Sequence, residues 1–333
     1  MNTVPGPAAG GISVVIPCYN EADNVVHVYA EVVAELGHLD LEVIFVDDGS
    51  DDGTLAAVKA LAEADPRVQY LSFTRNFGFE AAFSAGYRYA SRPWILHLDA
   101  DQQFPAAEAR RLIEVAEQGF DAVFGVRVDR DDPLVRRLGS SLFHLLAARL
   151  RIELPRGATA FRVVRTELAR TIVDLELGAP NFMATVPRLT SRYATVAVSH
   201  RSRQRGQSKV HVRALARHAV DLYVGAGQRL TTVVTTVAMV ASAVALLCAV
   251  ATPLGLVGAA ASRAVAFLLA AAALAVLGFT VRFLASMSAD QVRPRLFYVR
   301  ESTVQIRDED RLRQDRSPAN LRPDQAGGVR TPS

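Results

Sequence analysis

The chain contains Trp94-Ile-Leu-His-Leu-Asp-Ala-Asp-Gln-Gln-Phe-Pro105, in which a short apolar run ends in two carboxylates one residue apart. An apolar run of this length predicts a buried strand of a parallel sheet, and open α/β sheets bind ligands at the carboxyl ends of such strands. Asp99 and Asp101 can point to the same side of the backbone and converge on one hard divalent cation. The alternative is that one of them caps the helix that Pro105 opens and the other is solvated.

Three earlier segments repeat this pattern of an apolar strand followed by a polar turn and a helix. Strands are expected at Ile12–Pro17, Leu41–Val46 and Val68–Phe73, each followed by a helix, and a fifth strand at Ala122–Phe124. Because strand and helix alternate with short connections, the sequence predicts βαβ units and a mainly parallel sheet. Right-handed crossovers then place the polar turns at one edge of that sheet.

The polar turns resemble the motif series of the family 2 inverting glycosyltransferases. The motifs are Val15-Ile-Pro-Cys-Tyr-Asn-Glu21, Val46-Asp-Asp-Gly-Ser-Asp-Asp-Gly-Thr54, Arg75-Asn-Phe-Gly-Phe-Glu80 and Asp99-Ala-Asp-Gln-Gln103. Four motifs in the family's order most resemble the dolichyl- or polyprenyl-phosphate mannosyl- and glucosyltransferases, over about residues 12–209. The resemblance implies a GT-A fold, which is Rossmann-like with helices flanking a mainly parallel sheet.

The same resemblance implies a nucleotide-sugar donor and assigns residues to it. Pro17, Tyr19 and Glu21 line the nucleotide pocket, Asp47 and Asp48 contact the nucleoside, and Asp99, Asp101 and Gln103 hold the metal and the diphosphate, with Asp101 a catalytic candidate. Mg²⁺ or Mn²⁺ suits such an oxygen-rich site, and the cation stabilises the charge on the departing nucleoside diphosphate. Taken singly, these residues have structural alternatives: Asp47 or Asp48 as a helix cap, Glu21 as a first-turn acid, and Arg75 as a surface ion-pair partner.

A basic loop supplies candidates for binding the acceptor. The segment from His200 to Lys209 resembles the family's Arg-x-x-Gly-x-Ser-Lys loop, which engages donor and acceptor phosphates, and the match falls on Arg203, Gly206, Ser208 and Lys209. Arg203 is the second catalytic candidate, and Arg127 and Arg137 are further candidates for phosphate contacts, since arginine binds phosphate bidentately. The alternative is a solvated basic loop or a contact with anionic lipid. Nucleic acid is disfavoured as a partner, because the net charge is only +3 and the loop adjoins an apolar segment.

Two apolar runs predict a membrane hairpin. Thr231–Pro253 has no charged residue, and its 23 or so residues would span ~34 Å as a helix, enough to cross a bilayer core. Ala264–Val281 is shorter but still long enough to cross it. More arginines lie on either side of the hairpin than in the turn between its two spans. The positive-inside rule therefore places the catalytic domain and the C-terminus in the cytoplasm, at the plasma (inner) membrane. Residues 210–229 have the apolar and basic stripes of an interfacial helix. The expected organisation is therefore a disordered tail at 1–11, a glycosyltransferase domain at 12–209, the interfacial helix, a hairpin at 230–283, and a mostly disordered tail at 284–333.

One departure from the family concerns Gly157-Ala-Thr-Ala-Phe-Arg162, where Ala160 replaces the acid of a Gly-Asp-Phe-Arg motif. A phosphate monoester acceptor has a second pKa of about 6, so it needs positioning more than deprotonation. His97 is expected to be a core histidine. The sequence thus predicts transfer of a hexose, of GDP-mannose or UDP-glucose type, to polyprenyl phosphate.

The sequence is compatible with one other function and excludes a further one. The alternative function is a non-catalytic or altered-acceptor glycosyltransferase-like membrane protein that binds nucleotide-sugar or lipid phosphate. A processive polysaccharide synthase is excluded, because its Gln-x-x-Arg-Trp motif needs a tryptophan other than Trp94. Association into a homo-oligomer is left open.

Overall fold

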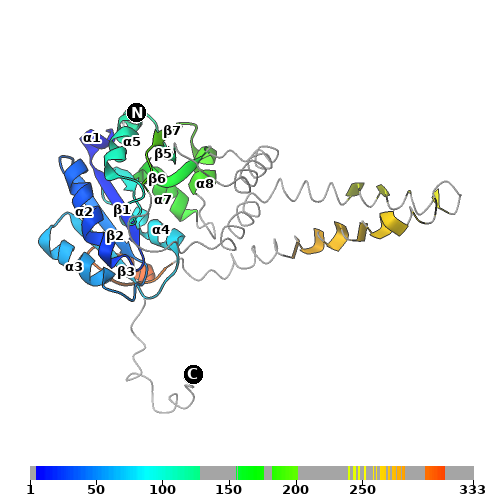
Figure 1. Ribbon diagram of the computed structural model, residues 1–333, viewed down its shortest axis with the longest axis horizontal. Coiled ribbons are helices and arrows are strands. Elements are labelled where there is room, and N and C mark those ends of the chain that lie inside the picture. The colour runs from blue at the N-terminus through cyan, green and yellow to red at the C-terminus, as the bar shows by residue number, and fades with distance from the viewer. Residues whose placement is uncertain are drawn as a thin grey trace, which may run out of the picture.

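A computed structural model of the 333-residue chain describes residues 5–127, 155, 157–175, 182–201 and 297–311, and short pieces between 239 and 281. Its described residues form an eight-stranded sheet in the order β7-β5-β6-β4-β1-β2-β3-β8 (Figure 1). The strands are β1 (Ile12–Cys18), β2 (Leu41–Asp47), β3 (Val68–Phe73), β4 (Trp94–His97), β5 (Ala122–Arg127), β6 (Ala158–Arg165), β7 (Tyr193–Val198) and β8 (Val299–Ser302).

Strands β1, β2, β3 and β4 pair in parallel, and so do β5 and β7. Strand β6 runs antiparallel to both β4 and β5, and β8 runs antiparallel to β3. The helices are α1 (Pro7–Gly10), α2 (Ala22–Leu36), α3 (Thr54–Ala64), α4 (Phe79–Tyr89), α5 (Ala109–Ala116), α7 (Thr166–Asp174) and α8 (Phe182–Leu189), with 3-10 turns η1 (Ala106–Glu108) and η2 (Asp308–Asp310). The predicted mainly parallel α/β sheet with flanking helices is confirmed.

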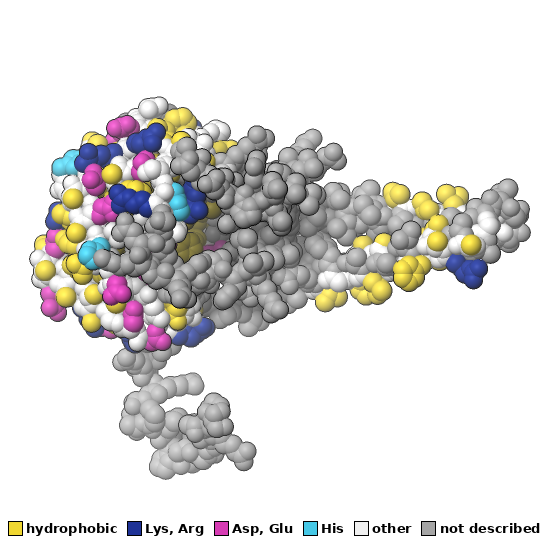
Figure 2. Space-filling model, in the orientation of Figure 1, with side chains coloured by type: hydrophobic (Ala, Val, Ile, Leu, Met, Phe, Trp, Pro, Cys, Tyr) yellow, Lys and Arg dark blue, Asp and Glu magenta, His cyan; other side chains and the backbone are white. Residues whose placement is uncertain are grey.

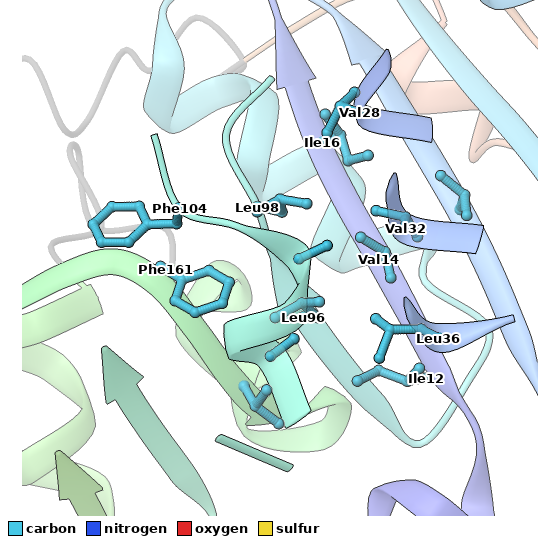
Figure 3. Packing of buried hydrophobic residues seen from close by; sticks show 14 of the residues in the cluster. Ile12, Val14, Ile16, Val28, Val32, Leu36, Leu96, Leu98, Phe104 and Phe161 are labelled. Atoms are coloured by element: carbon cyan, nitrogen blue, oxygen red, sulfur yellow. The ribbon is translucent and has the colours of Figure 1, made fainter. Parts of the chain in front are cut away.

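The central strands β1 and β2 are buried on both faces, which explains why they are mostly apolar along their length rather than alternating. Every residue of β1 is buried. Side chains of one parity, such as Val14 and Ile16, pack against α2, as Figure 3 shows, and Val15 belongs to the opposite core with residues of α4. A sheet covered in this way leaves the ends of its strands as the places where polar side chains gather.

The two expected tails are more ordered than predicted. At the N-terminus, the Trp94 indole donates a hydrogen bond to the Pro5 carbonyl at 2.9 Å and α1 follows directly. At the C-terminus, residues 297–311 add β8 to the edge of the sheet beside β3, the orange segment of Figure 1. Phe297 is buried and stacks on Phe73 with ring centroids 5.1 Å apart. The prediction of disorder was therefore wrong for residues 5–11 and 297–311, because both segments bury apolar or hydrogen-bonded groups against the domain.

The predicted membrane hairpin is not established by the structure. In the part of the chain that is described, no helix combines the length and apolar character needed to cross a bilayer. The predicted interfacial helix at 210–229 and most of the first predicted span lie outside the described residues. The described pieces between 239 and 281 expose large apolar side chains, among them Met239 and Phe267, and Figure 2 shows this apolar surface in yellow.

Candidate functional site

The carboxyl ends of β4, β1 and β2 lie next to one another, because these three parallel strands are neighbours in the sheet. The turn after β1 is tied to the turn after β2 by three hydrogen bonds: Asn20 N to Ser50 Oγ at 2.9 Å, Asp51 N to Asn20 Oδ1 at 3.1 Å, and Glu21 N to Thr54 Oγ1 at 2.9 Å. Asn20 adopts a φ of 54°, a conformation that asparagine tolerates better than most residues. The first two sequence motifs therefore form one connected surface.

Asp47 and Asp48 are buried at the end of β2 and organise the turns around them. Asp47 accepts hydrogen bonds from the Ser50 amide at 3.0 Å and the Ser72 hydroxyl at 2.8 Å. Asp48 accepts from the amides of Phe77 and Gly78, at 2.7 and 2.9 Å. Burial raises the pKa of Asp48 to about 6, the two amide hydrogen bonds oppose that rise, and the Asp47 charge adds to it.

Neither of these acids caps α3, which was their structural alternative. The carboxylate that accepts the Thr54 amide at the start of α3, at 2.8 Å, belongs to Asp52. Asp47 and Asp48 instead join the turn after β2 to the turn after β3, which contains Arg75. This is the arrangement expected of residues that shape a ligand site rather than a single helix end.

Asp99 and Asp101 lie in the turn after β4, as predicted. The Asp99 side chain is 29% exposed, and its Oδ1 lies 3.4 Å from His97 Nε2. Asp101 Oδ1 accepts the Gln103 amide at 3.1 Å, which holds the turn in shape. The Gln103 side-chain oxygen accepts from Arg127 Nη2 at 3.4 Å, so Gln103 has a polar partner of its own besides its assigned metal role.

The donor set fits a hard cation in part. Two partly exposed carboxylates one residue apart supply oxygen ligands of the kind Mg²⁺ and Mn²⁺ prefer, with substrate phosphates and water completing the shell. Within the described residues, His, Cys, Asp and Glu side chains nowhere gather in groups of three that could hold a metal ion. A metal at this site would therefore depend on the bound diphosphate as much as on the protein.

A buried polar chain behind Asp99 was not predicted as part of the site. Arg162 Nε donates to the Tyr87 hydroxyl oxygen at 2.8 Å, and that hydroxyl lies 2.9 Å from His97 Nδ1. The Arg162 guanidinium lies against the rings of Phe83, Tyr87 and Phe182, with centroids 4.7 to 5.4 Å from its Cζ. His97 is fully buried, which confirms it as a core histidine, and burial lowers its pKa. The sequence signal for Arg162 was its match to the Phe-Arg of the family motif.

Ala160 lies on β6 two residues before Arg162, in a stretch where the register between β5 and β6 is irregular. Arg162 is the register partner of His97 on β4, and Asp99 follows His97 by two residues. Alanine at position 160 therefore removes a negative charge from the strand that pairs with β4, the strand after which Asp99 lies.

The turn after β4 is also held by Arg127 at the end of β5, by Phe161 in β6 and by residues that follow β7. Phe104 stacks on Phe161 with ring centroids 5.3 Å apart, the Arg127 guanidinium lies 5.5 Å from the Phe104 ring, and the Arg201 amide donates to the Gln103 carbonyl at 2.9 Å. Burial and the Arg127 charge lower the pKa of His200, which packs edge-on against Phe104. Arg127 and the start of the basic loop thus contact the acidic turn, while their predicted roles in phosphate binding stay predictions.

The remaining predicted residues fall into two groups. Pro17 is buried in β1 opposite Val46, and Tyr19 and Glu21 are partly exposed in the turn that follows. Arg137, Arg203, Ser208 and Lys209 lie outside the described residues, so their roles stay predictions.

The described residues form a GT-A-like α/β fold with a mainly parallel sheet. Residues 13–172 match the family described as Glycosyl transferase family 2. Among relatives, the undecaprenyl-phosphate 4-deoxy-4-formamido-L-arabinose transferase of Pseudomonas syringae is 35% identical over 206 residues, covering 60% of each chain. The transferase of the same name from Salmonella paratyphi A is 33% identical over 218 residues, covering 63% of this chain and 66% of the relative. The chain thus spans less than two thirds of these relatives.

A solved structure shows the same fold. Glucosyl-3-phosphoglycerate synthase from Mycobacterium tuberculosis, solved with Mn²⁺, uridine-diphosphate and phosphoglyceric acid, has a TM-score of 0.50 and 18% identity, covering 66% of this chain and 80% of the other. At this identity the likeness concerns the fold alone.

Proposed function

We propose that the protein is a membrane-anchored inverting glycosyltransferase that moves a hexose from a nucleotide-sugar, of GDP-mannose or UDP-glucose type, to polyprenyl phosphate. The observation that carries the proposal is that the Asp47–Asp48 turn and the Asp99–Asp101 turn follow β2 and β4, the two parallel strands that flank β1, within the part of the chain that matches glycosyltransferase family 2. The names of the two relatives, which are undecaprenyl-phosphate transferases, support a lipid phosphate as the acceptor.

In this proposal the chain's own residues bind and orient the donor. Tyr19 and Glu21 line the nucleotide pocket that the Asp47–Asp48 turn shapes, and Asp99 and Asp101 hold a divalent cation. When bound, Mg²⁺ or Mn²⁺ supplies Lewis-acid stabilisation of the charge on the diphosphate. Crystals of the Mycobacterium tuberculosis structural relative contain Mn²⁺ with uridine-diphosphate, which is compatible with this choice of ion.

The acceptor phosphate is the nucleophile. One of its oxygens attacks the anomeric carbon in line while the bond from that carbon to the nucleoside diphosphate breaks, which inverts the configuration. Since the monoester is largely ionised near neutral pH, the missing acid at Ala160 is not required as a base. Arg127, whose guanidinium donates to the Gln103 side chain in the acidic turn, would attract the acceptor's negative charge.

The test is a transfer assay with the full chain in detergent. Purified protein is mixed with polyprenyl phosphate, Mn²⁺ or Mg²⁺ and radiolabelled UDP-glucose or GDP-mannose, and label is counted in the organic phase. We expect lipid-linked label from one donor, lost on chelation and reduced at least ~100-fold in Asp101→Asn. The matched control is Asp40→Asn, because Asp40 is 63% exposed and pairs with Arg92 at the opposite end of the strands.

Each outcome has a distinct meaning. Full activity of Asp101→Asn would remove the metal assignment while leaving the transfer reaction in place. Absence of lipid label with both donors, alongside intact nucleotide binding, would overturn the proposed acceptor and favour the nucleotide-sugar-binding protein that Ala160 suggests.

A further inference from the structure

Strand β8 contains a bulge at Arg300. The register pairs Ser72 with Glu301 and Phe73 with Val299, so Arg300 is an extra residue of β8 without a partner position on β3. A bulge of this kind bends the strand and changes the direction of a side chain. Here the Arg300 side chain reaches β3, and its Nη2 donates to the Ser72 hydroxyl oxygen at 3.3 Å.

Ser72 links Arg300 to Asp47 in the predicted nucleotide pocket through a second hydrogen bond. The Ser72 side chain is fully buried, and its hydroxyl donates to Asp47 Oδ2 at 2.8 Å. A hydroxyl has one proton and two lone pairs, so a proton given to Asp47 leaves a lone pair for the guanidinium. The hydrogen bonds therefore run in one direction, from Arg300 to Ser72 to Asp47.

Arg300 brings a positive charge close to two buried carboxylates, Asp47 and Asp48. Asp47 and Asp48 are adjacent carboxylates with 0% and 4% exposure, an arrangement that a nearby cation stabilises. Asp47 Oδ1 is held by the Ser50 amide, so Ser72 and Arg300 account for the other oxygen. A carboxylate held at both oxygens fixes the end of β2 and the turn that follows it.

We propose that Arg300 is a positioning residue for the nucleotide-sugar donor, which holds Asp47 in place through Ser72. The C-terminal segment that follows the predicted hairpin thereby completes the nucleotide pocket of a domain that begins at the other end of the chain. This inference rests on the proposed function, since it takes the Asp47 turn to be the nucleotide pocket.

The segment is anchored independently of Arg300, so the residue can be changed without releasing the strand. Thr74 N donates to the Tyr298 carbonyl at 3.1 Å, Lys59 Nζ lies 2.6 Å from Glu301 Oε2, and Arg88 Nη1 lies 3.2 Å from Asp310 Oδ2. The same segment offers a matched control in Arg307. Its side chain is 52% exposed, against 48% for Arg300, and the carboxylate paired with it belongs to Glu309.

The experiment measures binding of UDP and GDP to the full chain with Mn²⁺ by isothermal titration calorimetry. We expect Arg300→Ala to raise the dissociation constant of the preferred nucleotide roughly threefold to tenfold, the range of a partly exposed charged hydrogen bond. Ser72→Ala should act in the same direction, Arg300→Lys should restore part of the affinity, and Arg307→Ala should leave it unchanged. In the transfer assay, the donor KM should rise while kcat and the acceptor KM stay constant.

The outcomes separate this inference from the proposed function. If the wild-type chain binds UDP or GDP and Arg300→Ala binds it equally well, the positioning role is overturned and the donor site stands. An equal loss of affinity in Arg300→Ala and Arg307→Ala would also overturn it, because general charge would then explain the effect. If the wild-type chain binds neither nucleotide, the proposed donor site is overturned, and the positioning role of Arg300 is overturned with it.

Discussion

Asp48 and Gly78 are joined across two turns, because the Gly78 amide at the start of α4 donates to Asp48 Oδ2 at 2.9 Å. This carboxylate at the end of β2 therefore fixes the position at which α4 begins. It does so while buried, which raises its pKa from an ordinary 3.8 to about 6. The third motif of the sequence is thus held to the second by a group whose protonation changes in a measurable pH range.

The pH dependence of stability should reveal this group. Between pH 4 and 6 the folded chain keeps the Asp48 proton while the unfolded chain loses it, so the free energy of unfolding falls as the pH rises through this window. Relative to Asp48→Asn, the wild type should lose about 1–2 kcal/mol between pH 4.5 and 7.5, allowing for partial solvent screening. Denaturant titrations followed by the fluorescence of Trp94, the only tryptophan, measure this difference. A pH-independent difference would show that Asp48 titrates normally.

Glycine is required at position 49 by a close backbone approach. Gly49 has a φ of +67°, and a Cβ there would lie 2.4 Å from the Arg75 carbonyl carbon. Gly49→Ala should therefore cost about 2–4 kcal/mol, from positive φ and from overpacking together, and should weaken nucleotide binding. Gly119 also has positive φ, at +96°, but a Cβ there meets nothing within 4 Å. Gly119→Ala should cost only about 1–2 kcal/mol in the same denaturation assay. Equal costs for Gly49→Ala and Gly119→Ala would show that the turns after β2 and β3 can move apart to make room for the added Cβ.

The βα units and the acidic turns were predictable because their signals are local. An apolar run ending in Pro17, Asp47 or Asp99 marks both a strand and the polar group that follows it, and the sheet order then brings those groups together. Strands β6, β7 and β8 were not predicted, because each pairs with a strand distant in the sequence. No local pattern specifies such a pairing.

The unpredicted site residues share a physical cause. Arg162 and Arg300 carry charges whose partners are rings or hydroxyls from other elements. A motif match marked Arg162 without showing those partners, and Arg300 belongs to no motif. Tyr87 follows the apolar pattern of α4, and only the fold shows that its hydroxyl joins Arg162 to His97. The sequence motifs contain the groups predicted to face the donor, whereas the side chains that hold those groups are revealed by the fold.

Removal of the Tyr87 hydroxyl should destabilise the domain. Tyr87→Phe leaves Arg162 Nε and His97 Nδ1 without the partner they share in a fully buried position, which should cost about 1–3 kcal/mol. Tyr29→Phe is the matched control, because Tyr29 is only partly buried and its partner Asp65 keeps a bond from Arg67 at 2.6 Å. Denaturation midpoints followed by Trp94 fluorescence compare the two variants. A cost for Tyr87→Phe no larger than for Tyr29→Phe would mean that the buried chain contributes little.

The docking of the C-terminal segment should depend on Asp310. This residue is 1% exposed, and its carboxylate accepts hydrogen bonds from Arg88 and from the Tyr89 hydroxyl. Asp310→Ala leaves the Arg88 charge poorly compensated and should cost about 2–4 kcal/mol, together with faster amide hydrogen exchange across residues 297–311. Glu309→Ala is the control, since Glu309 is 50% exposed and its ion pair with Arg307 should be worth less than about 1 kcal/mol. Unchanged exchange in Asp310→Ala would show that β-pairing and the Phe297 stack hold the segment by themselves.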